Sequence, residues 1–454
     1  MGSLLDFFSK PKHPSDGNGI APTSSSAQAD PRSGSERVVT AQSLKDPQRG
    51  EPADSDRAAL QGTLRRLILV VERFPREYDV MYCALLDMLR TLERQDNMTS
   101  FLEVWSALVS DILTTPQWLD LLFPEQTAAD PTLVSRARAL QYGRHLPIQA
   151  TSAESADLGP IEHPASRLSN RLIEQLLRDL ATDDPDHGPP FLFLSRFYFF
   201  RDILFGYFVD VSLKPIQRAI FHQCYLQRHN WRHSYAADYP YQGMERLGVS
   251  GIKPSDERFA RYDIAEYLRP SDKLLDIGSN NGLWALSLAA SVGHVDALEF
   301  NPYLVAIANI AKEHIGTDNV SFIPGDFVDF DTEEKYDVLC SLANHCTIDG
   351  NLSMGFEQYV AKVFSLLKPG GILLFESHNV FGPGSGRPGD DGDLDAKFDI
   401  AERYFSVLKY KMTPAYVPAF DIDKLFVVMR RREQYEPTAT RTLSLSEAKT
   451  RYEY

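Results

Sequence analysis

The stretch that decides the fold is Leu274-Leu275-Asp276-Ile277-Gly278-Ser279-Asn280-Asn281-Gly282, an apolar run that enters a turn containing two glycines. An apolar strand, an acidic residue, a glycine turn and then a helix is the order in which an α/β sheet receives a nucleotide-like cofactor. Gly278 lets the backbone turn sharply because it has no Cβ, and Gly282 lets the next helix begin close to a ligand. The spacing differs from the G-x-G-x-x-G pattern of dinucleotide folds, and this turn has no Gly-Lys-Ser/Thr for a triphosphate.

The composition is that of a soluble globular protein with two or three domains. The 454 residues are 43% hydrophobic and 24% charged, which suffices for a large core. The net charge of −15 argues against a surface built for phosphate backbones, so no DNA partner is expected and RNA is disfavoured. Four cysteines without C-x-x-C spacing predict reduced thiols, a cytoplasmic location and no metal site. The N-terminus shows no signal-peptide pattern.

The chain before the glycine turn divides into three parts. Residues 1–55 are rich in Ser, Gly, Pro and Asp, which predicts a disordered tail, with a short apolar start at Leu4–Phe8 that could dock on a partner. Residues 56–145 carry apolar residues at helical spacing and predict a small helical domain that supports the fold or forms a homo-oligomer. Residues 146–254 combine a linker, a second helical block and a lid segment. The aromatic run Phe191–Val211 is interrupted by Arg196, Arg201 and Asp202, which favours a protein core or pocket wall over membrane contact.

The lid segment directly precedes the α/β part of the chain. From Tyr225 to Tyr262 it gathers aromatic, His and Arg residues with little periodicity, which is typical of a pocket rim. Lys253 or Arg258 would there pair with a carboxylate of a substrate or cofactor. Ion pairs on the surface of a connecting segment are the alternative.

From residue 255 to residue 431, continuous apolar runs alternate with helical patterns. This predicts a parallel sheet covered by helices on both faces. After the first strand, strands are expected at Val295–Glu299, Val320–Ile323, Tyr336–Leu342 and Ile372–Phe375. The segments Tyr404–Tyr410 and Leu425–Met429 predict an antiparallel hairpin that completes seven strands. Residues 432–454 are expected to form a C-terminal tail.

Acidic residues follow two of these strands. Glu299 stands 21 residues after Gly278, at the tip of the second strand, where a carboxylate can accept from both ribose hydroxyls of a nucleoside. Asp326 follows the third strand and could accept from an adenine amino group, with Phe327 against the ring. The second, correctly spaced carboxylate makes the site more specific than a lone glycine turn.

In this order the elements resemble the class I S-adenosylmethionine-dependent methyltransferases over about residues 255–431. The resemblance rests on the D-x-G-x-x-x-G turn, Glu299-Phe300-Asn301-Pro302, Gly325-Asp326-Phe327, the strand-four segment and an expected helix stop and turn at Leu367-Lys368-Pro369-Gly370-Gly371. It implies an α/β fold, a seven-stranded doubly wound Rossmann-like methyltransferase sheet with an added all-helical N-terminal region. It also implies S-adenosylmethionine as the cofactor, with these binding residues: Asp276, Gly278, Ser279, Asn280, Gly282, Glu299, Phe300, Asp326, Phe327 and Ser341.

Methyl transfer from a sulfonium mainly requires that the protein align the nucleophile and, for a hydroxyl, remove its proton. Residues that follow strands four and five face the ligand crevice of such a sheet. Among them, His345 and His378 have solution pKa values suited to a general base. We expect His345 to be the base, with Asp349 or Glu376 orienting it; histidines that only shape the pocket are the alternative.

An acidic stretch lies between Gly382 and Glu402. Its acidic residues occupy positions 1, 3, 5, 9 and 12 of a calcium-loop spacing, namely Asp391, Asp393, Asp395, Asp399 and Glu402. Ala396 stands where such a loop needs glycine. A mobile acidic loop over the acceptor site is therefore favoured over a calcium site.

The sequence thus predicts a cytoplasmic methyltransferase acting on oxygen or nitrogen of a small-molecule, glycan-like or other sugar-containing acceptor. An RNA-modifying alkyltransferase of the wobble-uridine type is one alternative, suggested by the Trp231–Lys253 segment. The Asn-Pro-Pro-Tyr tetrapeptide of enzymes that methylate nucleic-acid amino groups does not follow strand four. A non-catalytic scaffold with a methyltransferase fold is the other alternative.

Overall fold

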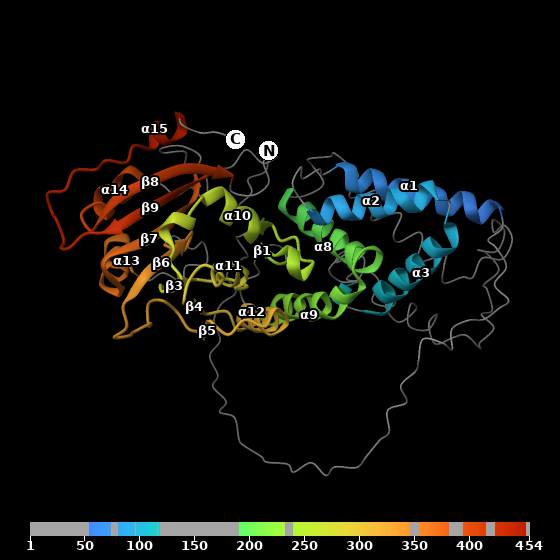
Figure 1. Cartoon of the computed structure of the whole chain (residues 1–454), viewed down its shortest axis with the longest axis horizontal. Helices are drawn as coiled ribbons and strands as arrows, with labels where there is room; N and C mark the ends of the chain where they lie inside the picture. Colours follow the sequence, from blue (N-terminus) through green and yellow to red (C-terminus); the bar gives the residue numbers. More distant parts are fainter. Residues whose placement is uncertain are drawn as a thin grey trace, which may run out of the picture.

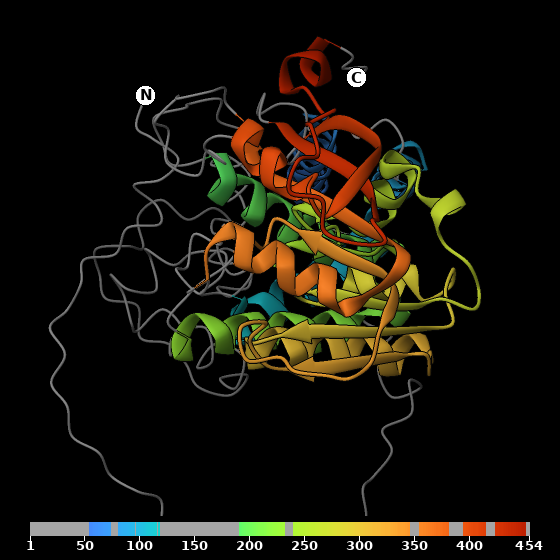
Figure 2. The same ribbon diagram turned by 90° about the vertical axis from the view of Figure 1, so that its left-hand side faces the viewer.

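The computed structural model describes residues 54–73, 80–95, 97–115, 117–118, 190–231, 239–345, 354–380, 394–414 and 423–450. In these ranges a twisted sheet with helices on both faces lies beside a layer of helices from the N-terminal half (Figures 1 and 2). The predicted tail, apart from residues 54 and 55, lies outside the described residues, as does the predicted linker from residue 146 to about residue 165.

The main sheet has seven strands in the order β5-β4-β3-β6-β7-β9-β8. Five are parallel: β3 (Lys273–Ile277), β4 (His294–Glu299), β5 (Val320–Pro324), β6 (Tyr336–Leu342) and β7 (Leu367–Val380). The hairpin of β8 (Phe405–Pro414) and β9 (Asp423–Arg431) adds to β7 in antiparallel fashion. Strand order reverses at β3, which has β4 on one side and β6 on the other, and the crevice for a ligand lies there at the carboxyl ends. The predicted seven-stranded, doubly wound sheet is confirmed.

Helices cover both faces of this sheet. One face carries α10 (Ser255–Tyr262), α11 (Leu283–Leu288) and α12 (Pro302–Ile315), and the other carries α13 (Phe356–Leu366) and α14 (Leu394–Ala401). Successive strand residues point to opposite faces, so Leu274 belongs to one hydrophobic cluster and Leu275 to the other. This is why the strand sequences read as unbroken apolar runs.

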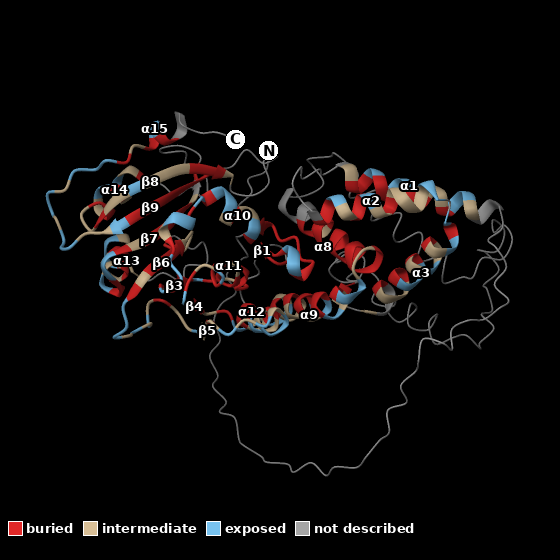
Figure 3. Cartoon of the chain, viewed as in Figure 1, coloured by how far each residue is buried: buried red, intermediate tan, exposed pale blue. Residues whose placement is uncertain are grey.

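The N-terminal helices form a layer next to the first of these faces. They are α1 (Asp54–Arg73), α2 (Val80–Arg94), α3 (Met98–Thr114), α8 (Pro190–Phe208) and α9 (Lys214–Asn230). Helix α9 lies alongside α12, and both helices belong to one hydrophobic cluster with α11 (Figure 1). From Ser195 to Phe208, α8 is buried almost all round, which confirms that this part of the aromatic run is core (Figure 3). Among the described residues, no helix combines the length and apolarity that crossing a bilayer would need.

An approach segment, residues 239–254, connects the helical layer to the sheet. It contains the short parallel strands β1 (Gln242–Gly243) and β2 (Lys253–Pro254), separated by a 3-10 turn at Glu245–Leu247. Further 3-10 turns occur at Val211–Leu213 and Ala265–Tyr267. In Figure 1, β1 lies between α8 and α11; the segment contacts α11 through β1 and α8 through the bond from Ser250 N to Asp202.

Two segments differ from the sequence predictions. The expected turn at Leu367–Gly371 is part of β7, whose pairing with β6 skips from Tyr336–Leu367 to Val338–Ile372 around Gly370, with φ 73°. The expected mobile acidic loop is wrong for Leu394–Ala401, which is helix α14; residues 381–393 lie outside the described part. Beyond β9, α15 (Leu445–Thr450) packs against β8.

Among the residues of the calcium alternative, Asp391 and Asp393 lie outside the described part, and the other three have protein partners. Asp395 and Asp399 both pair with Arg441, and Glu402 accepts from Thr442 N and Leu443 N, each at 2.8 Å. In the described ranges, no group of three or more His, Cys, Asp or Glu side chains is arranged to hold a metal ion.

Candidate active site

The loop after β3 turns through three residues in the left-handed region of backbone space. They are Gly278 with φ 61°, Asn280 with φ 56° and Gly282 with φ 74°. Asparagine is one of the few residues with a Cβ that adopt this conformation readily, so it can replace a glycine here. A Cβ on Gly278 would lie 2.6 Å from the Oδ1 of Asn344, and one on Gly282 would lie 2.5 Å from the Cβ of Ala308. The two glycines are therefore required by space as well as by backbone conformation.

Glu299 braces this loop from the tip of β4. Its Oε2 accepts from Asn280 N at 2.9 Å and its Oε1 accepts from Asn301 N at 2.9 Å. The side chain is buried at the carboxyl edge of the sheet. Each carboxylate oxygen can accept a second hydrogen bond, so Glu299 can hold the loop and a ligand together.

Asp276 lies buried beneath the loop, within β3. Its Oδ2 atom has no hydrogen-bond partner among the described residues. Burial raises the pKa of this carboxyl to about 7, with Arg258 opposing the rise and the Glu299 carboxylate adding to it. A buried oxygen without a donor is rare in folded proteins, and it is expected where a ligand supplies the donor.

Three cations surround Glu376 on the same face of the sheet as Asp276. Lys253 Nζ donates at 2.6 Å, Arg258 Nη2 lies at 3.4 Å from both carboxylate oxygens, and Lys424 Nζ lies at 3.5 Å. All four side chains are buried. Burial alone would raise the pKa of Glu376, but the three cations outweigh it and hold that pKa far below its usual range. The alternative of surface ion pairs is wrong for Lys253 and Arg258; pairing with a ligand carboxylate stays a prediction.

The candidate bases lie at the ends of β6 and β7. His345 is buried in an aromatic box, with ring centroids 4.7 Å from Phe375 and 5.3 Å from Phe356. Phe375 and Glu376 are neighbours on β7 and point to opposite faces, so this geometry separates Glu376 from His345. His378 is half-buried on β7. Asp349 lies outside the described residues, and its role stays a prediction.

Ser341 and Phe327 lie on the face that α13 covers. Ser341 Oγ is 2.7 Å from Tyr359 Oη, and the Phe327 ring is 5.2 Å from the Tyr359 ring. Asp326 is half-buried at the edge and accepts from Val328 N at 3.0 Å. Their roles in binding a cofactor stay predictions.

Phe300 lies on the other side of the loop, next to the helical layer. Its ring centroid is 5.9 Å from that of Trp231, which follows α9. The N-terminal helices thus reach the residue next to Glu299.

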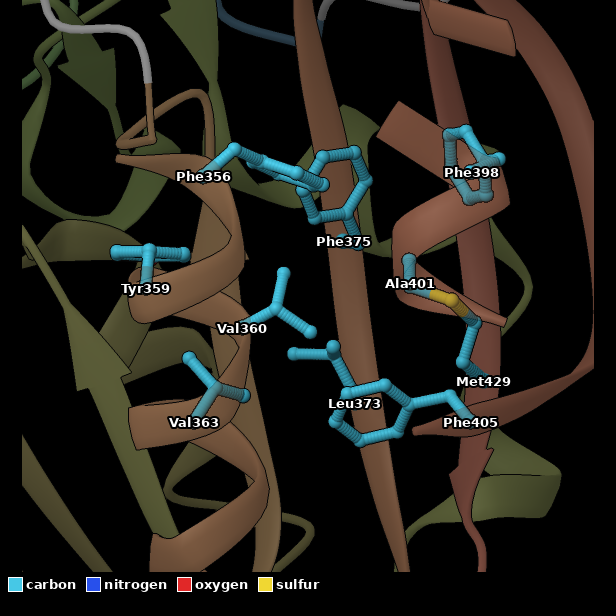
Figure 4. A pocket seen from close by; sticks show the side chains of 10 residues that line it. All are labelled: Phe356, Tyr359, Val360, Val363, Leu373, Phe375, Phe398, Ala401, Phe405 and Met429. Carbon is cyan, nitrogen blue, oxygen red and sulfur yellow. The ribbon is translucent and has the colours of Figure 1, made fainter. Parts of the chain in front are cut away.

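A small apolar cavity lies behind the aromatic box (Figure 4). Its volume is about 10 Å³, and its walls are Phe356, Tyr359, Val360, Val363, Leu373, Phe375, Phe398, Ala401, Phe405 and Met429. That volume is at most one water molecule, and the walls offer it no polar partner. The cavity is a packing gap and not a place for an acceptor.

Three residues at this site were not singled out from the sequence. Asn344 Nδ2 donates to Ile277 O, and the chain reaches that position through Ala343, which has φ 60°. A polar residue directly after a parallel strand faces the crevice, so Asn344 could have been found by that rule. Lys424 and Gln242 carry no such local signal, because their partners lie far away in the sequence.

Comparisons with known proteins give one family model and two short matches to curated methyltransferases. Residues 268–407 match a family model described as a methyltransferase domain. A protein-L-isoaspartate O-methyltransferase of Koribacter versatilis is 39% identical over 67 residues, which is 15% of this chain and 30% of that protein. A probable ribosomal RNA small subunit methyltransferase A of Methanothermobacter thermautotrophicus is 37% identical over 84 residues, which is 18% of this chain and 30% of that protein.

The chain therefore spans less than a third of the length of these two curated relatives. Among solved structures, the N-methyltransferase NodS of Bradyrhizobium japonicum in complex with S-adenosyl-L-homocysteine aligns with 49% of this chain and 99% of its own. The sequence identity is 14% and the TM-score is 0.33.

Proposed function

This chain contains a class I S-adenosylmethionine-dependent methyltransferase domain, and we propose that it methylates oxygen or nitrogen of a small-molecule or sugar-containing acceptor. The observation that carries the proposal is the loop after β3. Its left-handed residues, the hydrogen bonds of Glu299 to it and the buried Asp276 oxygen, which has no donor in the described ranges, fit a cofactor that brings its own hydrogen-bond donors. In this proposal the reaction takes place in the cytoplasm.

In this proposal, different residues at the carboxyl edge of the sheet bind different parts of the cofactor. S-adenosylmethionine, when bound, supplies a methyl group that is already activated for transfer. We assign its methionine part to Asp276 and the 278–282 loop, its ribose to Glu299, and its adenine to Asp326 with Phe327. Because Asp276 and Glu299 are acidic, both favour a cofactor that carries positive charge.

The acceptor would enter from the ends of β6 and β7. We assign proton removal to His345, whose aromatic surroundings keep water away, with His378 as the second candidate. Since Glu376 is occupied by three cations, Asp349 becomes the orienting carboxylate in this proposal.

Calorimetry with S-adenosylmethionine tests the cofactor part. Glu299→Ala should weaken binding by about 10-fold or more, because a hydrogen bond to a charged group contributes roughly 1.5–3 kcal/mol. Glu313→Ala, on the exposed side of α12, is the matched control and should bind as the wild type does. Equal affinity for the wild type and Glu299→Ala would overturn the assignment.

Transfer of labelled methyl groups to small metabolites, glycans and RNA tests the acceptor part. His345→Ala should lose transfer while it keeps cofactor binding. Label that appears only in RNA or protein would contradict the proposed acceptor class. One relative is named as a probable ribosomal RNA methyltransferase, but this chain covers 30% of it, and the net charge of −15 opposes RNA binding. Cofactor binding without transfer to any acceptor would favour the scaffold alternative.

A further inference from the structure

Gln242 in β1 makes two hydrogen bonds to the cofactor loop and one to the start of helix α11. Its Nε2 donates to Ser279 O at 3.0 Å, its Oε1 accepts from Trp284 N at 2.9 Å, and its backbone oxygen accepts from Asn281 Nδ2 at 2.9 Å. The side chain is buried. The orientation of the amide is fixed by its partners, because a carbonyl can only accept and a backbone N–H can only donate.

The Gln242 side chain accepts from a backbone N–H at the start of α11 that no residue of the cofactor loop caps. The first N–H groups of a helix have no partner within the helix, and a capping side chain usually satisfies one of them. Helix α11 follows Gly282, which has no side chain to do this. Trp284 is the second residue of α11, so the Gln242 amide takes the place of the missing cap and also holds the loop at Ser279. A residue about forty positions upstream thus fixes both ends of the turn.

The backbone of β1, next to Gln242, is in tight contact with the Ser250–Gly251 turn. Strands β1 and β2 pair so that Gln242 lies opposite Lys253. A Cβ on Gly243 would lie 1.8 Å from Ser250 O, and one on Gly251, which has φ 66°, would lie 2.1 Å from Gly243 N. The two backbones therefore touch, and a shift of the Ser250–Gly251 turn must move β1.

Helix α8 fixes that turn through a buried carboxylate. Asp202 Oδ2 accepts from Ser250 N at 3.0 Å and from Tyr239 Oη at 2.5 Å, and Tyr239 Oη accepts from Gly251 N at 2.9 Å. Gln217 of α9 adds bonds from its Nε2 to Asp202 O at 2.8 Å and to Gly248 O at 2.7 Å. Asp202, Tyr239, Gln217 and Ser250 are all buried, so water does not compete for these bonds.

We propose that Gln242 is a positioning residue for S-adenosylmethionine, and that through it Asp202 couples the N-terminal helical layer to the cofactor loop. This rests on the proposed function. The helices then form part of the cofactor site without touching the cofactor. Because coupling between two sites is reciprocal, cofactor binding must also stabilise the segment Gly248–Gly251, which contains the Ser250–Gly251 turn.

The test uses Gln242→Met, which keeps the length of the side chain, removes its two hydrogen bonds to Ser279 O and Trp284 N, and leaves the backbone bond from Asn281 in place. Gln223→Met, on α9 and half-buried, is the matched control. Calorimetry should show S-adenosylmethionine binding at least about 10-fold weaker in Gln242→Met, since lost bonds to buried groups cost roughly 1–3 kcal/mol. KM for the cofactor should rise more than kcat falls. Hydrogen exchange without cofactor should be faster at residues 280–286. Binding within twofold of the wild type, with unchanged exchange, would overturn the proposal.

Two further measurements keep the proposal testable if Gln242→Met does not fold. Asp202→Asn should weaken cofactor binding although Asp202 lies in the helical layer. In the wild type, S-adenosyl-L-homocysteine should slow hydrogen exchange at residues 248–251; no change there would contradict the coupling. Wild-type protein that binds no S-adenosylmethionine would refute the proposed function, whereas the exchange of residues 280–286 without ligand reports on the Gln242 contacts alone.

Discussion

Replacing Glu376 with glutamine should destabilise this protein more than almost any other isosteric change. The carboxylate is fully buried, and its side chain is 0% exposed. The side chains of Lys253, Arg258 and Lys424 are 6%, 5% and 3% exposed. Solvent therefore screens these charges little, and glutamine leaves three buried cations facing a neutral group. Breaking a buried pair from one side costs about 3–5 kcal/mol, and we expect a loss of that size in the free energy of unfolding.

Urea unfolding at pH 7.5 measures this loss. The matched control is Glu257→Gln, which breaks an exposed pair with Arg261, whose side chains are 41% and 42% exposed. Such a pair contributes about 0.5 kcal/mol or less. The double variant Glu376→Gln with Lys253→Met should lose less than the sum of the single variants, because it removes one of the uncompensated cations.

The pH dependence supplies a second check. The folded pKa of Glu376 lies below its unfolded value of about 4.3, so its contribution is complete above that pH and declines as pH falls below it. The difference between the wild type and Glu376→Gln should therefore shrink below about pH 4. A Glu376→Gln variant within about 1 kcal/mol of the wild type at pH 7.5 would refute the view that these cations depend on one carboxylate.

Two other changes test Asp276 and the loop after it, and Gly316→Ala at the end of α12 serves as a control. Burial raises the pKa of Asp276 from 3.8 to about 7, so the folded state loses stability as pH rises between those values. In thermal melts without cofactor, the melting temperature of Asp276→Asn relative to the wild type should rise from about pH 4 to about pH 7 and then stay constant. A relative melting temperature that does not change over this range would contradict the prediction. Gly316→Ala, where φ is 72° and no described atom lies within 4 Å of the added Cβ, should lower the free energy of unfolding by about 1 kcal/mol. Gly282→Ala, where φ is 74° and the added Cβ would lie 2.5 Å from the Cβ of Ala308, should lower the free energy of unfolding in urea by roughly 1–3 kcal/mol more than Gly316→Ala does. Equal losses for the two variants would show that the neighbours of Gly282 move aside without cost.

The sheet could be predicted from the sequence because its signals are local. Buried parallel strands read as short apolar runs, and Leu274–Ile277 lies in such a run directly before its glycine turn. The position of Glu299 followed from the length of one β-α-β unit. The place of Asp276, Gly278 and Glu299 at one edge then came from strand order alone.

The charged cluster and the Gln242 contacts could not be predicted in this way. Lys253 and Glu376 are 123 positions apart, and Gln242 reaches partners 37 and 42 positions away. Periodicity within one element says nothing about which distant segment it meets. Helix α14 was missed for a different reason. Leu394, Phe398 and Ala401 have helical spacing and are buried, but the acidic residues between them suggested a loop.

The match to the methyltransferase family begins at residue 268, whereas the hydrophobic cluster on that face of the sheet begins at Leu60 in α1 and continues to Val428 in β9. A chain cut at residue 268 would leave Glu376 without Lys253 and Arg258, and would expose the side of α12 that α9 covers. The smallest piece of this protein that can be produced as a stable enzyme is therefore set by its shared core and not by the family boundary. Recombinant production should begin no later than α1.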